Sequence, residues 1–144
     1  MARYYKTIDS YHLSYQFVLD LYQATKNFPK SEEQNITSQL KRAAVSIPLN
    51  IAEGSCKASP KEFVHFLNTA FASAKEVEVL LQLSHDLGFL PQIEFDSLSK
   101  KLDEICAKLF MFTRNIESRI SDRNPKFRFF QEFKKETVEK NNQS

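Results

Sequence analysis

Apolar residues recur at three- and four-residue steps along four long stretches of the chain, which is the spacing of one face of an α-helix. The predicted helices cover about residues 9–25, 37–54, 60–88 and 92–121. The alternation of apolar and polar residues that is typical of strands is absent, so the pattern predicts an all-α fold. Because the connections are short, we expect antiparallel neighbours in an up-down-up-down four-helix bundle.

Residues that favour helix ends support these boundaries. Ser59 stands at the cap position of the third helix, before a proline, which suits the first helical turn. Thr37 is the expected cap of the second helix, and Gly54 is its expected left-handed end. Pro48 removes an amide donor inside that helix, but the apolar steps continue through Ile51. We therefore expect a bend near Pro48 and not an end.

The second predicted helix carries a polar stripe beside its apolar one. Its members recur at three- and four-residue steps: Gln39, Arg42, Ser46, Asn50 and Glu53. Small or apolar residues lie between the stripes, which suits the close approach of another helix. Two interpretations stay open, an ordinary solvated face and a polar contact inside the bundle or between subunits.

The charged ends of this stripe need partners if they are buried. Arg42 lies three turns from Glu53, so the two cannot touch within one helix. Arg42 could reach Glu53 of a neighbouring subunit, or Glu76 or Glu78 of the third helix. The predicted oligomer interface or buried polar network is therefore Arg42, Ser46, Asn50, Glu53, Glu76 and Glu78.

Composition narrows the class of protein. A chain of 144 residues fits one domain, and its apolar runs are too short to span a membrane. No apolar signal core is present, so we expect a cytoplasmic protein in which Cys56 and Cys106 are free thiols. The three histidines have no metal-ligand spacing, and no catalytic motif or phosphate loop occurs. We therefore expect no enzyme activity, no metal and no cofactor.

Charge divides the chain into a bundle at residues 1–123 and a tail at residues 124–144. The first part holds 15 basic and 15 acidic side chains, whereas the tail holds five basic and three acidic ones. The tail phenylalanines either fold back onto the bundle or form an arm that stacks on single-stranded nucleic acid or docks on a partner. The candidate contact residues of such an arm are Lys126, Arg128, Phe129, Phe130, Lys134 and Lys135.

The second and third predicted helices also carry a family resemblance. The matching motifs are Arg42 to Ala44, Ser46 to Pro48, Asn50 to Gly54, Phe63 to Leu67, and the pair Glu76 and Glu78. The chain resembles, over roughly residues 11–120, the small four-helix-bundle proteins encoded in intervening sequences of bacterial 23S ribosomal RNA genes. It departs from the family pattern in having Ala72 in place of the usual glycine before Ser73, and in lacking tryptophan.

The resemblance implies a ring-like homo-oligomer, with five subunits favoured. It also implies a relation to the accessory proteins of diversity-generating retroelements, in which a similar bundle serves a reverse transcriptase. Two function classes follow. One is a non-enzymatic oligomeric bundle that binds RNA, DNA or a nucleic-acid enzyme such as a reverse transcriptase. The other is an assembly or scaffold protein that is linked to ribosomal RNA only by the location of its gene.

Overall fold

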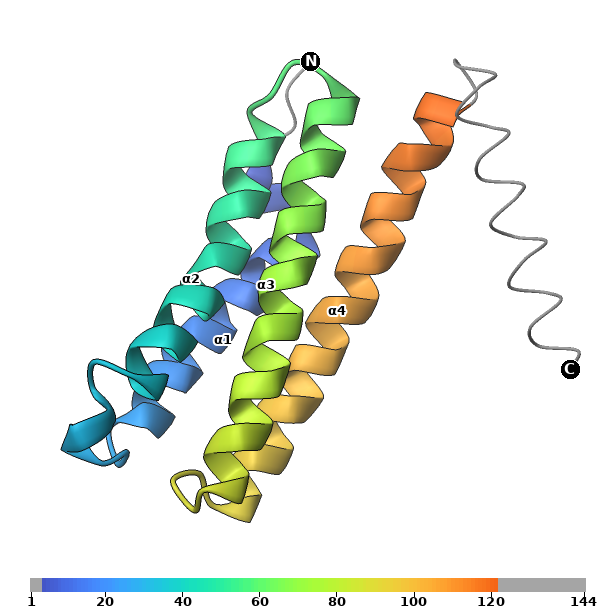
Figure 1. The fold of residues 1–144 in the computed structure, drawn as a ribbon. Helices are drawn as coiled ribbons and strands as arrows, with labels where there is room; N and C mark the ends of the chain where they lie inside the picture. The colour runs from blue at the N-terminus through green and yellow to red at the C-terminus, as the bar shows by residue number, and fades with distance from the viewer. Residues whose placement is uncertain (1–3, 122–144) are drawn as a thin grey trace, which may run out of the picture.

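Four long helices make up most of the computed structural model, which describes residues 4–121 (Figure 1). Their bounds are α1 Asp9–Thr25, α2 Ile36–Ser55, α3 Pro60–Asp86 and α4 Gln92–Ser121. Two short 3-10 helices, η1 Tyr5–Thr7 and η2 Lys30–Glu32, precede α1 and α2. No strand occurs among residues 4–121. The all-α prediction and the four predicted helices are confirmed.

Each long helix packs against two others. α2 lies against α1 and α3, and α4 lies against α3 and α1. Figure 1 shows α1 behind α2 and α3, with the chain turning back at each connection. This arrangement leaves one side of every helix facing away from the other three.

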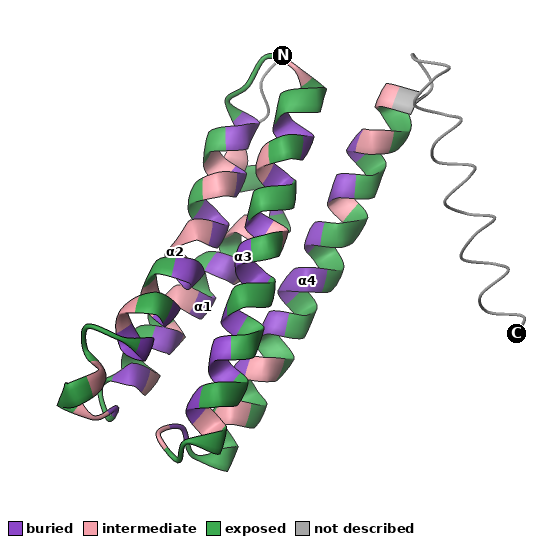
Figure 2. Ribbon diagram, in the orientation of Figure 1, coloured by how far each residue is buried: buried purple, intermediate pink, exposed green. Residues whose placement is uncertain are grey.

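The apolar stripes predicted from the sequence meet in the middle of the molecule (Figure 2). On α2, the residues Leu40, Ala44, Ile47 and Ile51 have no exposed surface. Other fully buried side chains come from the remaining helices, among them Phe17, Leu21, Leu67, Leu81, Leu102, Ile105 and Leu109. Each buried leucine, isoleucine or phenylalanine stabilises the fold by about 1.5–3 kcal/mol relative to an exposed one.

The beginning of α2 differs from the prediction. The helix starts at Ile36, with Asn35 at the cap position, and no side chain caps it. Thr37 is buried inside the first turn, and its Oγ1 has no hydrogen-bond partner. The cap assigned to Thr37 was therefore wrong, because burial of Ile36 in the core extends the helix past it.

The two glycines, Gly54 and Gly88, have different roles in the structure. Gly54 lies inside α2, and its φ is not in the left-handed region, so the prediction of a left-handed end there was wrong. A Cβ at Gly54 would lie 2.6 Å from the Cβ of Phe66, which means that α3 passes too close to admit any side chain. The left-handed residue is Gly88, with φ of 81°, just after α3. α2 continues through Pro48, as predicted, and ends at Ser55, and the bend near Pro48 stays a prediction.

The hydropathy of the helices differs from what a bilayer requires. Within residues 4–121, none of the helices is both long enough and apolar enough to cross a membrane.

Candidate functional site

The outward side of α2 forms one wall of an open groove, and α1 contributes to the other wall. The groove has a volume of about 590 Å³. Four of the residues that the polar stripe singled out line it, namely Arg42, Ser46, Asn50 and Glu53. Tyr22 from α1 and Leu49 from α2 line it as well. The fold therefore brings the predicted polar residues of α2 onto one accessible surface.

Part of the polar stripe also joins α2 to α3. The hydroxyl oxygens of Ser46 and Ser73 lie 2.8 Å apart and share a hydrogen bond. The Asn50 side-chain amide donates to the Ser46 carbonyl at 2.7 Å and to its hydroxyl at 2.9 Å. These bonds satisfy half-buried polar groups where two helices meet, each with a net worth of about 1 kcal/mol. Within the single chain, Ser46 therefore makes a polar contact between α2 and α3, and both Asn50 bonds stay within α2.

The charged residues of the predicted network do not join it within a single chain. Arg42 is exposed, and its guanidinium donates to Ser38 Oγ at 3.1 Å. Glu53 and Glu76 are exposed too, while Glu78 pairs with Lys75 on the same helix at 2.9 Å. Among residues 4–121, no ion pair links Arg42 to any of these three glutamates. A role for Arg42 and Glu53 in a subunit contact stays a prediction.

Large apolar side chains continue the groove along α1 and α2. Tyr15, Leu19 and Tyr22 are spaced four and three residues apart on α1, so they share one side of the helix, and all are exposed. On α2, Leu49 is 58% exposed, and the half-buried Val45 lies one turn before it. The Lys41 ammonium lies 4.6 Å from the centre of the Tyr22 ring, which joins the two helices. We call these five apolar residues, Tyr15, Leu19, Tyr22, Val45 and Leu49, the outer α1–α2 face.

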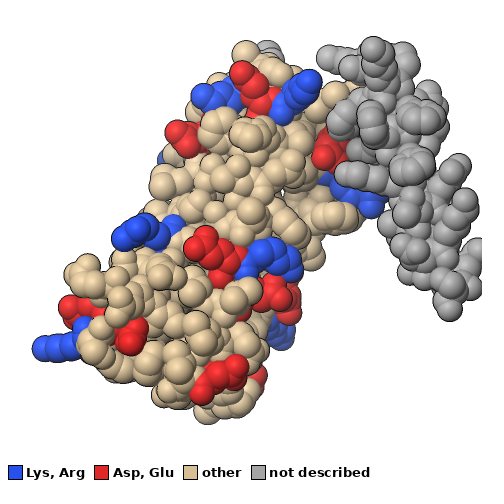
Figure 3. Space-filling view, in the orientation of Figure 1, with Lys and Arg blue, Asp and Glu red and all other residues tan. Residues whose placement is uncertain are grey.

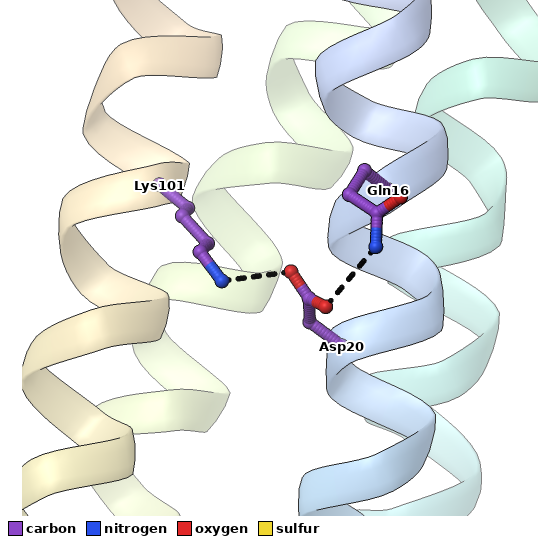
Figure 4. Close-up of polar contacts among 3 residues, drawn as sticks. All are labelled: Gln16, Asp20 and Lys101. Carbon is purple, nitrogen blue, oxygen red and sulfur yellow. Dashed lines mark hydrogen bonds and ion pairs between the residues drawn. The ribbon is translucent and has the colours of Figure 1, made fainter.

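Exposed charge elsewhere is mixed in sign. Figure 3 shows basic and acidic side chains interspersed on the visible face, with no large patch of one sign. On the side formed by α1 and α4, Lys101 Nζ lies 2.8 Å from an Asp20 oxygen, and Gln16 donates to the same carboxylate at 3.2 Å (Figure 4). A pair this exposed contributes at most about 1 kcal/mol. The face that Figure 3 shows therefore lacks the concentrated basic charge that binds a phosphate backbone.

Histidine and cysteine side chains are the remaining candidates for chemistry in the described chain. No group of three or more histidine, cysteine, aspartate or glutamate residues within the described chain could hold a metal ion. The His85 ring stacks on Phe95 at 4.5 Å, and its Nδ1 is bonded to the Leu90 carbonyl. Cys56 is an exposed free thiol, whereas Cys106 is buried, and burial raises the pKa of the Cys106 thiol.

The predicted tail residues cannot be placed, and two residues of the site were not predicted. The tail residues Lys126, Arg128, Phe129, Phe130, Lys134 and Lys135 lie outside the described residues. Sequence reasoning did not assign Ser73 to the polar network, although it stands at the position where the family pattern has Gly-Ser. It also did not assign Leu49 to a surface. Its step of four residues from Val45, away from the buried stripe, was the signal that could have found it.

The sequence and the fold are similar to those of known proteins. The family described as the 23S rRNA-intervening sequence protein matches residues 6–111. A crystal structure of a protein of unknown function from the S23 ribosomal protein family of Bacteroides thetaiotaomicron is similar, with a TM-score of 0.65 and 25% identity. The similarity covers 72% of this chain and 97% of that one. No protein with a curated description matches the chain.

Proposed function

Because the chain belongs to the 23S rRNA-intervening sequence protein family, we propose that it is a non-enzymatic helical bundle that assembles with copies of itself through the outer α1–α2 face. The exposed apolar side chains of that face carry the proposal. A monomer leaves them in water, although contiguous apolar surface on a soluble protein usually marks an interaction site. A second copy is the occupant that the resemblance to oligomeric relatives supports.

An antiparallel order of the helices is part of this proposal. Two ion pairs support it for α1 and α4, since Asp9 lies near Lys108 whereas Asp20 lies near Lys101. For α2 and α3, Ser46 contacts Ser73, and Gly54 approaches Phe66. In both pairs of helices, residue numbers rise along one helix as they fall along the other. In such a bundle α1 and α2 are neighbours, so their outward sides form one continuous surface.

The charges beside the face suit a repeated contact between subunits. Arg42 and Glu53 line the same groove and lie three turns apart on α2. In a closed ring, Arg42 of one subunit comes within reach of Glu53 of the next, and the same contact recurs around the ring. Such a pair fixes register more than it adds stability. The resemblance to the family favours five subunits.

The solution mass tests the assembly. We expect light scattering at micromolar concentration to give a multiple of the mass of one chain. Glu53→Ala should lower the stability of the assembly, because it leaves Arg42 of the neighbouring subunit without its carboxylate, and Glu53→Gln should lower it less. A wild-type monomer would refute the assembly. An unchanged mass and dissociation constant for Glu53→Ala would leave the assembly standing and remove Glu53 from the contact.

The tail supports a second candidate function, contact with nucleic acid or with a nucleic-acid enzyme such as a reverse transcriptase. It combines five basic side chains with four phenylalanines, whereas residues 1–123 are neutral. Aromatic side chains among basic ones suit single-stranded nucleic acid, whose bases stack and whose phosphates attract cations. The competing proposal is a scaffold that binds no nucleic acid.

One titration with RNA separates these two proposals. If the tail binds phosphates, the affinity for a single-stranded RNA should fall steeply and linearly with the logarithm of the salt concentration. The same samples should contain intact RNA after incubation with Mg²⁺, because we propose no nuclease activity. Binding that is absent at low salt would favour the scaffold. Metal-dependent cleavage that a single substitution in this chain abolishes would contradict the non-enzymatic proposal.

A further inference from the structure

One stretch of the chain, around the α3–α4 connection, carries acidic charge without basic charge. Residues 76–99, which run from α3 through the connection into α4, contain five carboxylates and no lysine or arginine. All five are exposed: Glu76, Glu78, Asp86, Glu94 and Asp96. Two of them accept hydrogen bonds from neutral amides, Asp86 from Gln82 and Asp96 from Gln92. Just outside the span, Lys75 pairs with Glu78 at 2.9 Å, so four of the five carboxylates take part in no ion pair among residues 4–121.

Apolar side chains are exposed in the same region. Val79, Leu83 and Leu87 follow one another at four-residue steps along the end of α3 and are 67%, 45% and 54% exposed. Singly exposed apolar residues are common, but three at this spacing form a continuous line along the helix. We call this line the α3 ridge. Glu76 precedes it along α3, and Asp86 lies within it in sequence.

We propose that the α3 ridge binds the C-terminal segment 126–135 of a neighbouring copy of the chain. This inference rests on the proposed self-assembly. The segment contains four basic residues, one acidic residue and four phenylalanines. Its phenylalanines suit the apolar ridge, and its lysines and arginine suit the carboxylates beside the ridge. The complementarity is both apolar and electrostatic, which is what sets the register and the partner of a contact.

The length of the chain favours a neighbour's segment over the chain's own. α4 has 30 residues and is about 45 Å long. His85 stacks on Phe95, which lies 26 residues before Ser121, so the ridge from Val79 to Leu87 spans roughly 30–42 Å along the helix from Ser121. Figure 1 shows the α3–α4 connection and the end of α4 at opposite ends of the molecule.

A fully extended chain gains at most about 3.4 Å per residue. Phe127, six residues beyond Ser121, therefore reaches only about 20 Å along the axis, and Phe130 reaches about 31 Å. The beginning of the segment, including Phe127, stops short of its own ridge, so the whole segment can lie along a ridge only on a neighbouring copy. A neighbouring copy has no such limit. A contact between two different patches joins subunits head to tail, which closes into a ring when the rotation permits.

Cross-linking of the full-length protein tests this contact. A sample assembled from equal amounts of ¹⁴N- and ¹⁵N-labelled chains is treated with a carbodiimide, which joins an amine to a carboxylate only where they touch. We expect peptides that link Lys134 or Lys135 to Glu76, Asp86 or Glu94, with one ¹⁴N and one ¹⁵N partner in about half of them, as random mixing requires. Cross-links with both partners always of the same isotope would overturn the proposal in favour of a segment bound to its own chain.

Substitutions on the ridge provide the control. Leu83→Asp should reduce the yield of these cross-links by about tenfold or more, because it places a charge in the apolar contact. Met111→Asp, at a similarly exposed residue of α4, should leave the yield unchanged. An unchanged yield in Leu83→Asp would overturn the proposal.

A charge exchange across the contact tests the electrostatic part. Asp86→Lys should reduce the yield, because it places an amine opposite the amines of the segment. Its combination with Lys134→Glu and Lys135→Glu should restore the yield, since the amine and the carboxylates have then exchanged sides and the carbodiimide can still join them. An unchanged yield in Asp86→Lys alone would contradict the proposed pairing of charges.

The mass of the same samples separates this inference from the proposed assembly. If the wild type is an oligomer but no tail cross-link to residues 76–99 forms, the ridge contact is wrong and the assembly through the outer α1–α2 face stands. A wild-type monomer contradicts both. A segment that forms no cross-link to the bundle but binds single-stranded RNA with a steep salt dependence replaces the ridge contact with nucleic-acid binding.

Discussion

Leu49→Asp is expected to convert the assembled protein into folded monomers. Leu49 is 58% exposed in the single chain and belongs to the outer α1–α2 face, one turn after Val45. A carboxylate there would lose its hydration at the subunit contact without gaining a partner, which costs several kcal/mol. A cost of about 3 kcal/mol alone raises the dissociation constant of each contact by more than about 100-fold. Light scattering over a dilution series measures this change.

The fold should survive this substitution, because Leu49 is more than half exposed and is not one of the buried core residues. We expect the helical circular dichroism signal of Leu49→Asp to match that of the wild type at the same concentration. Met111→Asp is the matched control, since Met111 is 59% exposed but lies on α4, away from the face. Retention of the wild-type mass by Leu49→Asp would remove the outer α1–α2 face from the assembly. Dissociation of both variants would show that the effect is not specific to the face.

The features that depend on local sequence could be predicted. The stripe of Leu40, Ala44, Ile47 and Ile51 is fully buried because a period of 3.6 residues directs all four side chains to one side of α2, wherever the partner helices lie. α3 begins at Pro60, because proline lacks the amide that a helix leaves unpaired in its first turn, although the Ser59 side chain at the cap position makes no capping hydrogen bond. Both arguments need only the neighbouring residues in the chain.

The features that depend on how two helices meet could not be predicted. Ser46 was placed on a polar stripe, but its partner Ser73 follows 27 residues later and is fixed by the register of α2 on α3. Thr37 had the right residue type for a cap, yet burial of Ile36 started the helix earlier. Gly54 was predicted to end the helix, because the sequence shows that this residue is small but does not show that Phe66 of α3 lies against it.

The candidate site also has a part that local sequence predicts and a part that depends on contacts between helices or subunits. Arg42, Ser46, Asn50 and Glu53 line one groove, as the helical spacing of the polar stripe indicates. Only Ser46 bonds across the contact between α2 and α3, and Asn50 supports it from within α2, whereas Arg42 and Glu53 are exposed. What those two charges contact across a subunit boundary depends on a second molecule, and a sequence pattern says nothing about its position.

Gly54→Ala is the substitution expected to destabilise the single chain most for its size. A Cβ at this position would lie 2.6 Å from the Phe66 Cβ and 3.4 Å from the Phe63 carbonyl oxygen. Neither neighbour is the flexible end of a side chain, so α3 must move away from α2. Overpacking of this kind costs about 1–3 kcal/mol, against which the better helix propensity of alanine returns about 1 kcal/mol. We expect a net loss in the free energy of unfolding, measured by urea denaturation.

Comparison with Gly54→Asn distinguishes close packing from a left-handed helix end. Asparagine tolerates the left-handed conformation better than alanine, so at a left-handed end Gly54→Asn would be the milder change. Gly54 has no such conformation, and its side-chain position is filled by Phe66. Asparagine is larger than alanine and should therefore cost more, by about 1 kcal/mol or above. Removing the Phe66 ring with Phe66→Ala should not rescue Gly54→Ala, because the contact involves the Phe66 Cβ, which alanine keeps. A milder effect of Gly54→Asn than of Gly54→Ala would mean that the close approach of α2 and α3 does not explain this glycine.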